Sequence, residues 1–172
     1  LMLHIAKSKA HQGPVRDECC LLLALGTGLR VSEIAALKIE DIDLKRGGNS
    51  LIVRHGKGDK LRVVKFSSSL KTLIQDYLDY RTSDSEYLFP SQRQDHMFPT
   101  AIQKVFKKWA RRSGLPPRFS IHSALHFYAS ELLRVSKNLR LVQQQLGHSS
   151  PQTTTVYAQV LDEEITEAVE KL

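Results

Sequence analysis

One block rich in β-branched residues interrupts a chain whose apolar residues are otherwise spaced as in helices. The runs SLIVRH (50–55) and LRVVKF (61–66) are separated by two glycines, Gly56 and Gly58. Two such runs divided by glycines predict an antiparallel hairpin. The sequence KRGGN before them predicts another tight turn, with a short strand near Ile42. We therefore predict an α+β, mainly α fold with a small three-stranded antiparallel sheet on one edge.

The segments on both sides of this block have the periodicity of helices. We expect Ser68 or Ser69 to cap the helix over 68–81. The helix over 99–114 is amphipathic, with basic residues outside and an inner face made of Ile102, Val105, Phe106 and Trp109. The predicted helices cover 14–28, 31–37, 68–81, 99–114, 122–135, 138–148 and 151–161, followed by an acidic tail helix over 161–172.

Length and composition fit one folded domain. A chain of 172 residues, 41% of them hydrophobic, can bury one core and is too short for two large ones. No apolar run approaches the roughly 20 residues of a membrane-spanning helix, and the first residues lack the features of a signal peptide. Cys19 and Cys20 are adjacent in an apolar helical run, where pairing is rare, so we expect a reducing cytoplasmic compartment.

The charge of the chain is strongly positive and unevenly distributed. The formal net charge is +7 and the pI is near 9.5, which favours a polyanion such as DNA as partner. The tail, LDEEITEAVEKL, is acidic instead. This distribution predicts a basic DNA-binding face with the tail packed elsewhere. The basic residues concentrate in two segments, Lys45, Arg46, Arg54, Lys57, Lys60, Arg62 and Lys65 in one, and Lys104, Lys107, Lys108, Arg111 and Arg112 in the other.

Two polar motifs in the first half of the chain have both a plain and a functional interpretation. Arg30 and Glu33 are one helical turn apart in TGLRVSEIAAL, which fits an ordinary ion pair within a helix. Lys57, between the hairpin glycines, fits a solvated turn lysine or one that reaches a DNA groove or a reacting phosphate. The nucleotide-binding P-loop is excluded, because its Gly-Lys-Ser/Thr sequence is absent.

The histidines in the second half leave their role open. His122 and His126 lie four positions apart on one helical face, a spacing that suits two metal ligands. The glutamate of the HExxH motif is missing and no third ligand is evident, so core or surface histidines are the simpler interpretation. His148 and Tyr157 follow in LGHSSPQTTTVYA, a run of small polar residues.

Taken in order, these pieces resemble the catalytic domain of the tyrosine recombinase, or phage integrase, family. The resemblance covers about residues 14–160 and rests on TGLRVSEIAALKIEDID, GKGDKLRVV and LGHSSPQTTTVYA. It implies a single catalytic domain over 1–172, with 1–13 ending a linker from an N-terminal DNA-binding domain and 161–172 as tail. The residues that match catalytic positions are Arg30, Lys57, His122, His148 and Tyr157, supported by Glu33 and His126. The predicted DNA-binding residues are Lys60, Arg62, Lys104, Lys107, Lys108 and Arg111.

The implied reaction is phosphoryl transfer on DNA with no metal and no other cofactor. Tyr157 would attack the scissile phosphate, form a 3′-phosphotyrosine bond and release a 5′-hydroxyl. A phenol ionises at about pH 10, so His122 would accept its proton, and Lys57 would protonate the leaving oxygen. Arg30 and His148 would donate hydrogen bonds to the non-bridging oxygens, where negative charge grows.

The implied partner is double-stranded DNA, on which the chain would form a homotetramer through its C-terminal tail. The isolated domain could also be a monomer. The tail could equally pack on its own domain instead of docking on a neighbouring protomer. The resemblance also implies a prokaryotic, nucleoid-associated protein that contacts no membrane.

Position 125 departs from the family pattern. A second catalytic arginine is expected three residues after His122, and Leu125 stands there. Leucine cannot donate a hydrogen bond to a phosphate oxygen, so we predict impaired cleavage with DNA binding retained. The alternatives are an inactive DNA-binding module of the same fold and an enzyme resembling a type IB topoisomerase.

Overall fold

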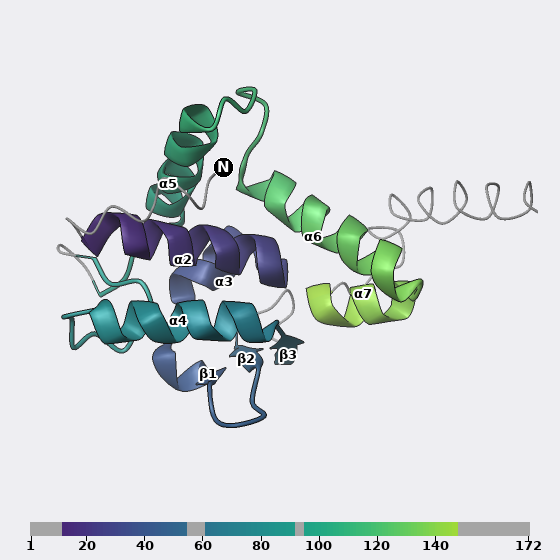
Figure 1. Ribbon diagram of the computed structural model, residues 1–172, viewed down its shortest axis with the longest axis horizontal. Helices are drawn as coiled ribbons and strands as arrows, with labels where there is room; N and C mark the ends of the chain where they lie inside the picture. The colour runs from purple at the N-terminus through teal and green to yellow at the C-terminus, as the bar shows by residue number, and fades with distance from the viewer. Residues whose placement is uncertain (1–11, 55–60, 92–94, 148–172) are drawn as a thin grey trace, which may run out of the picture.

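The computed structural model describes residues 12–54, 61–91 and 95–147. In chain order the elements are α2 (Gln12–Thr27), α3 (Val31–Ala36), a short 3₁₀ helix η1 (Ile39–Asp41), β1 (Ile42–Asp43), β2 (Ser50–Val53), β3 (Arg62–Lys65), α4 (Ser68–Tyr80), α5 (Pro99–Arg112), α6 (Ile121–Ser136) and α7 (Leu139–Leu146) (Figure 1). No helix in these ranges has both the length and the apolar character to cross a membrane. The predicted fold, mainly helical with one small sheet, is confirmed.

The three strands form one antiparallel sheet in the order β1-β2-β3. Leu51 in the central strand pairs with Ile42 on one side and Val64 on the other, and all three side chains are buried. The next pair, Ile52 and Val63, points to the opposite face and is exposed. This alternation follows from strand geometry, and it confirms both the predicted hairpin and the additional strand near Ile42.

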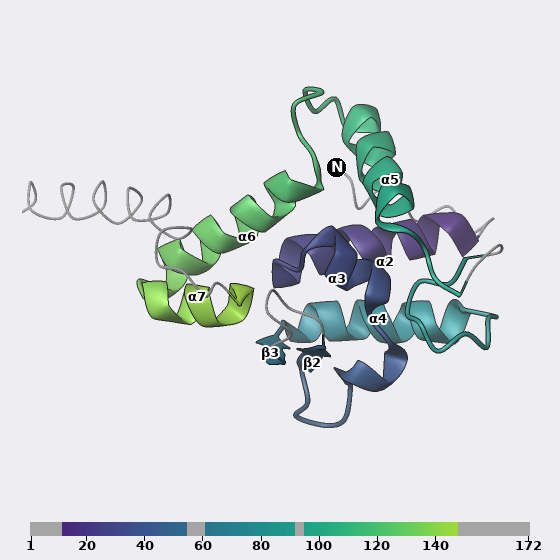
Figure 2. The ribbon, with the colours of Figure 1, turned by 180° about the vertical axis from the view of Figure 1, so that it is seen from behind.

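Helix α2 lies at the centre of the helical body. It packs against α3, α4, α5 and α6, and Figures 1 and 2 both show α4 running beside it. Leu23 of α2 is fully buried, and α4 turns the face formed by Leu70, Ile74 and Tyr77 toward the core. The Tyr77 hydroxyl donates a hydrogen bond of 3.0 Å to the Leu88 carbonyl, which ties the loop after α4 to the same core.

The N-cap of α4 is Ser67 rather than the predicted Ser68 or Ser69. The Ser67 hydroxyl oxygen accepts a hydrogen bond of 3.2 Å from the Leu70 N–H. This bond satisfies one of the free N–H groups at the start of the helix. Three consecutive serines carry the same hydroxyl, so the sequence does not separate them.

Helix α5 has the predicted amphipathic character. Its four predicted inner residues, Ile102, Val105, Phe106 and Trp109, are all buried. The helix ends at Arg112, and Gly114 follows with a left-handed φ of 72°. The inner face rests partly on Asp17 of α2, because the Trp109 indole N–H donates to the Asp17 carboxylate at 2.9 Å.

Helices α6 and α7 enclose a second, smaller apolar cluster. Its buried members are Ala129 and Leu133 of α6 and Val142 and Leu146 of α7. Figures 1 and 2 show this pair at one side of the helical body, where α6 runs from beside α2 to α7. The helix predicted over 122–135 is therefore confirmed, and the one predicted over 138–148 is confirmed as far as Leu146, where α7 ends. Residue 148 and the helices predicted over 151–161 and 161–172 lie outside the described residues.

Candidate functional site

The loop between α2 and α3 is held by Thr27 and Gly28. The buried Thr27 hydroxyl donates to the Leu23 carbonyl at 2.6 Å, which closes the last turn of α2. Gly28 has a φ of 63°, and a Cβ atom there would lie 2.5 Å from Tyr128 of α6 and 2.7 Å from Leu146 of α7. Glycine therefore lets α6 and α7 approach the backbone two residues before Arg30.

Arg30 is the N-cap residue of α3, and Glu33 holds it there. Glu33 Oε2 accepts a hydrogen bond of 2.7 Å from the Arg30 backbone N–H, and Oε1 accepts one of 3.1 Å from the Arg30 guanidinium. The Arg30 side chain is 33% exposed and that of Glu33 is 4% exposed. Within the described ranges, Glu33 is the only hydrogen-bond partner of the Arg30 guanidinium, which leaves other donors of that group without a partner there.

Glu33 also binds Arg62, the first residue of β3. Arg62 donates two hydrogen bonds, Nη1 to Glu33 Oε1 at 2.7 Å and Nη2 to Oε2 at 2.8 Å. Burial alone would raise the pKa of the Glu33 carboxyl, but the donors from Arg62 and Arg30 outweigh it and lower the pKa below its ordinary value. Glu33 is thus a buried carboxylate shared by two arginines.

Arg62 continues the network to the end of α7. Its Nε donates to the Gln145 carbonyl at 3.2 Å, and the Gln145 side chain accepts from the Lys65 N–H of β3 at 3.1 Å. A Cβ atom on Gly147 would lie 2.6 Å from Arg62 Cδ, so the arginine stem packs against the residue that precedes His148. One arginine therefore contacts both α3 and the end of α7.

In this geometry Arg62, which we predicted to bind DNA, donates its hydrogen bonds to acceptors of the protein. Its side chain is 9% exposed and its guanidinium is occupied by protein acceptors. The signal was present in LRVVKF, because alternation in a strand places Arg62 on the same face as the buried Val64. The contact with Gln145 joins residues 83 positions apart, and no local pattern marked it.

Helix α6 carries the next group of predicted site residues. His122 is exposed in its first turn, and His126 is exposed one turn further on. Leu125 is half-buried and packs against the apolar cluster of α6 and α7. Leu125 therefore contributes to helix packing and presents no hydrogen-bond donor. In the described ranges, no three His, Cys, Asp or Glu side chains group as metal ligands would.

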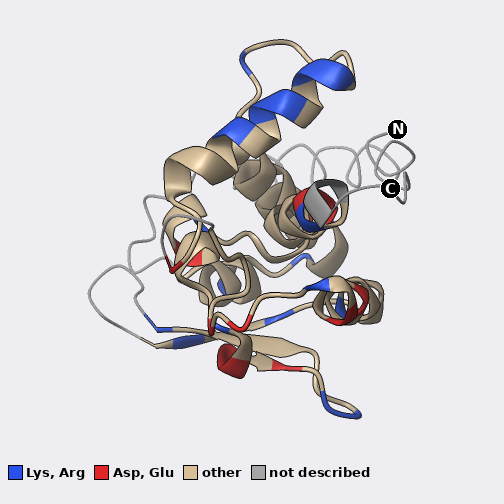
Figure 3. Ribbon diagram, turned by 90° about the vertical axis from the view of Figure 1, so that its left-hand side faces the viewer, with Lys and Arg blue, Asp and Glu red and all other residues tan. Residues whose placement is uncertain are grey.

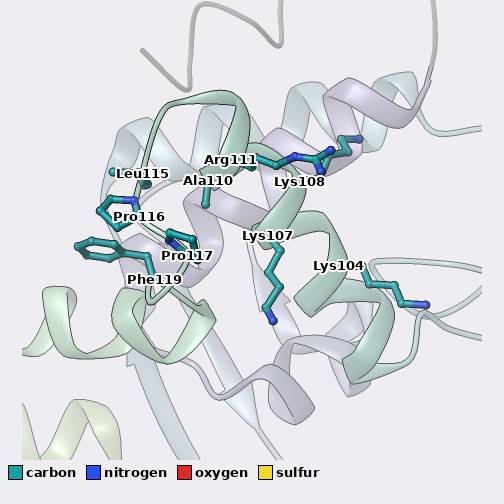
Figure 4. Close-up of a pocket in the computed structure, with 9 residues that line it drawn as sticks. All are labelled: Lys104, Lys107, Lys108, Ala110, Arg111, Leu115, Pro116, Pro117 and Phe119. Atoms are coloured by element: carbon teal, nitrogen blue, oxygen red, sulfur yellow. The ribbon is translucent and has the colours of Figure 1, made fainter.

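The basic face predicted for α5 is present. Figure 3 shows Lys and Arg in bands along α5, at the top of the view. Lys104, Lys107 and Arg111 are exposed and line a cavity of about 430 Å³, whose other wall is the loop with Pro116 and Phe119 (Figure 4).

Lys108 differs from its basic neighbours on α5. Its ammonium donates to the Asp17 carboxylate at 2.5 Å and lies 4.8 Å from the centre of the Trp109 ring. Although Lys108 also borders the cavity, its charge is paired, so we expect it to contribute less to DNA binding than Lys104, Lys107 and Arg111.

The remaining predicted site residues, Lys57, Lys60, His148 and Tyr157, lie outside the described residues. What the structure brings together is Arg30, Glu33 and Arg62 with the end of α7. Two of the site residues outside the described ranges are close to these segments in the sequence. Lys57 stands five positions before Arg62 (62 − 57), and His148 directly follows Gly147.

Comparison with known proteins gives consistent results. The model of the phage integrase family matches residues 1–164. "Tyrosine recombinase XerA" of Pyrococcus furiosus is 39% identical over 160 residues, which cover 91% of this chain and 54% of that protein. This chain thus spans about half the length of such curated relatives.

Solved structures of recombinases have the same fold. A crystal structure of XerA recombinase superposes with a TM-score of 0.81 at 30% identity, covering 97% of this chain and 60% of that one. The XerH site-specific recombinase bound to its difH substrate gives 0.78 at 25% identity, covering 91% of this chain and 47% of that one. Since the family model covers most of the sequence and the fold agrees, this chain belongs to the phage integrase family of tyrosine recombinases.

Proposed function

We propose that this chain is the catalytic domain of a site-specific DNA recombinase that cleaves and rejoins strands through a 3′-phosphotyrosine intermediate. The observation that carries the proposal is the position of Arg30, which is fixed by a buried carboxylate while its side chain remains 33% exposed. A preorganised, partly exposed guanidinium is suited to bind a phosphate oxygen. The relatives named tyrosine recombinases support the same function.

In the proposed reaction, Tyr157 attacks the phosphorus atom and the 5′-oxygen leaves. His122 accepts the phenol proton, and its exposed position on α6 keeps it accessible to substrate. Lys57 supplies a proton to the leaving oxygen. Arg30 and His148 stabilise the negative charge that develops on the non-bridging oxygens. The number of phosphoester bonds is conserved, so the reverse attack by a DNA hydroxyl needs no nucleotide cofactor.

Leu125 makes this domain a slow catalyst in the proposal. A missing donor to a developing oxyanion typically costs about 10²–10³ in rate. Leu125 packs on the α6–α7 cluster, so its side chain offers apolar contact and no donor. This observation favours the second candidate function, a DNA-binding module of the same fold that does not cleave.

DNA would lie across the basic face of α5, and the proposal extends to parts outside the described residues. An N-terminal DNA-binding domain would hold the opposite side of the duplex, and the acidic tail over 161–172 would join protomers into a tetramer. Removal of 161–172 tests the last point. Unchanged oligomerisation on DNA, measured by analytical ultracentrifugation, would remove the tail from the proposal.

Covalent capture distinguishes the two candidate functions. The protein is incubated with a pool of nicked duplexes of randomised sequence, in which a cleaved strand end diffuses away and traps the phosphotyrosine adduct. We expect few adducts with the unaltered protein, roughly 10²-fold more with Leu125→Arg, and none with Tyr157→Phe in either background.

Equal capture with leucine and arginine at position 125 would show that the protein is not impaired. No capture with Leu125→Arg, in a protein that still binds the duplex and remains folded, would favour the binding module. Adducts that persist in Tyr157→Phe would disprove the assignment of the nucleophile.

A further inference from the structure

We propose that Arg62 is a positioning residue that fixes the phosphate-binding group Arg30 against the end of α7, without itself touching the phosphate. The inference rests on the proposed function, since it concerns how that site is held together. It goes beyond that function in giving the hairpin a second task besides carrying Lys57.

The first step of the argument is the shared carboxylate. Arg30 and Arg62 both donate to Glu33 Oε1, at 3.1 and 2.7 Å, and Arg62 also donates to Oε2. The Glu33 carboxylate is almost fully buried, so it cannot turn toward solvent when one partner is lost. The orientation of the Arg30 guanidinium therefore depends on where Arg62 holds the Glu33 oxygens.

The second step is the contact with α7. Arg62 Nε donates to the Gln145 carbonyl, one of the last carbonyls of the helix, and the Arg62 stem meets the backbone of Gly147. Gly147 ends α7 with a left-handed φ of 66° and immediately precedes His148. Arg62 therefore holds the end of α7 against the same carboxylate that orients Arg30.

The third step is the geometry of the guanidinium itself. Arg62 uses Nη1 and Nη2 toward Glu33 and Nε toward Gln145, which point in different directions from one rigid plane. A lysine in its place keeps the charge beside Glu33 but cannot hold both acceptors at fixed positions. Charge compensation and positioning can thus be separated by the variant Arg62→Lys.

The experiment measures binding of inorganic phosphate to the full chain by NMR, following the Arg30 Nε–H and Gly147 N–H signals. Arg62→Lys is expected to weaken phosphate binding by roughly tenfold, as is usual for coupled residues in one hydrogen-bond network. Arg30→Ala is expected to weaken it too, and the double variant should be no weaker than Arg30→Ala alone. Losses that multiply in the double variant would mean that Arg62 binds the anion independently, which overturns the proposal.

Arg81→Lys serves as the matched control. Arg81 also donates to two protein carbonyls, those of Ser85 and Tyr87, but it lies at the end of α4 and makes no contact with Glu33 in the described residues. We expect it to leave phosphate binding unchanged. Full affinity in Arg62→Lys would overturn the positioning role, whereas absence of phosphate binding in the unaltered protein would count against the proposed function itself.

A second measurement uses the unaltered protein without phosphate, so it does not depend on whether a variant folds. In an acid titration of the unaltered protein, the Arg30 and Gly147 signals should shift together with the Glu33 carboxyl, because protonation of Glu33 releases Arg62. Separate midpoints for Arg30 and Gly147 would overturn the proposed coupling.

Discussion

Gly28 lies directly against the ring of Tyr128, and this contact seats α6 on the loop that leads to Arg30. Its left-handed φ of 63° and the 2.5 Å between an added Cβ and Tyr128 Cδ1 leave no room for a side chain. The same added atom would meet Leu146 of α7 at 2.7 Å. The close packing of α6 and α7 on this loop therefore requires a residue without a side chain at position 28.

Gly28→Ala is therefore expected to destabilise the fold. Left-handed strain and forced repacking together should lower the free energy of unfolding by about 2–5 kcal/mol. Gly114→Ala is the control, since Gly114 has a φ of 72° with open space around it and should lose only about 1–2 kcal/mol. Urea unfolding followed by fluorescence of Trp109, the sole tryptophan, measures both. Equal losses would show that the contact with Tyr128 adds nothing.

Two buried carboxylates predict acid sensitivity. Burial would raise the pKa of both Asp17 and Glu33, but hydrogen bonds to each carboxylate outweigh burial and lower the pKa. The donors to Asp17 are Lys108, Arg16 and Trp109. The donors to Glu33 are Arg62 and Arg30. A lowered pKa in the folded state stabilises the fold above the ordinary values, 3.8 and 4.5, and this stability is lost as the pH falls through the folded pKa.

The measurement is urea unfolding between pH 7 and pH 3. We expect stability to decline below about pH 4.5, with a shallower decline in Asp17→Asn and in Glu33→Gln, which are already less stable at pH 7. Glu131→Gln is the control, because the pKa of Glu131 is lowered by Arg134 at an exposed site where solvent screens the pair. A decline as steep in both buried-acid variants as in the unaltered protein would refute the assignment.

Cys19 and Cys20 are expected to resist thiol reagents while the protein is folded. Both are buried in α2, and burial raises the pKa of Cys20 to about 12 and that of Cys19 well above its ordinary value. Since the thiolate is the reactive form, labelling at pH 8 should require unfolding. The test is the rate of reaction with a chromogenic disulfide, with and without denaturing urea. Rapid labelling of the native protein at either position would contradict the burial of α2.

Much of the fold followed from local patterns. The hairpin, the inner face of α5 and the helices over 122–135 and 138–148 each depend on periodicity within a short window, which the sequence displays directly. The site was less predictable because its contacts join distant segments. Arg62 meets Gln145 across 83 positions, and Lys108 meets Asp17 across 91. The sequence shows that Arg62 and Lys108 are basic, but it does not show which acceptors the fold brings to them.

The salt dependence of DNA binding should separate exposed from paired basic residues. Lys104, Lys107 and Arg111 are exposed along α5. We expect the triple variant, in which each of them is replaced by Gln, to have a weaker salt dependence of DNA binding. The slope of the logarithm of the DNA-binding constant against the logarithm of the salt concentration should fall by about 0.9 for each phosphate that the protein no longer neutralises. Lys71→Gln on α4 is the control, because the Lys71 ammonium donates to the Lys45 carbonyl and α2 lies between α4 and α5 (Figure 1). Fluorescence anisotropy of a labelled duplex at several salt concentrations gives the slopes. An unchanged slope in the triple variant, with the slope reduced in Lys71→Gln, would move the DNA-binding face away from α5.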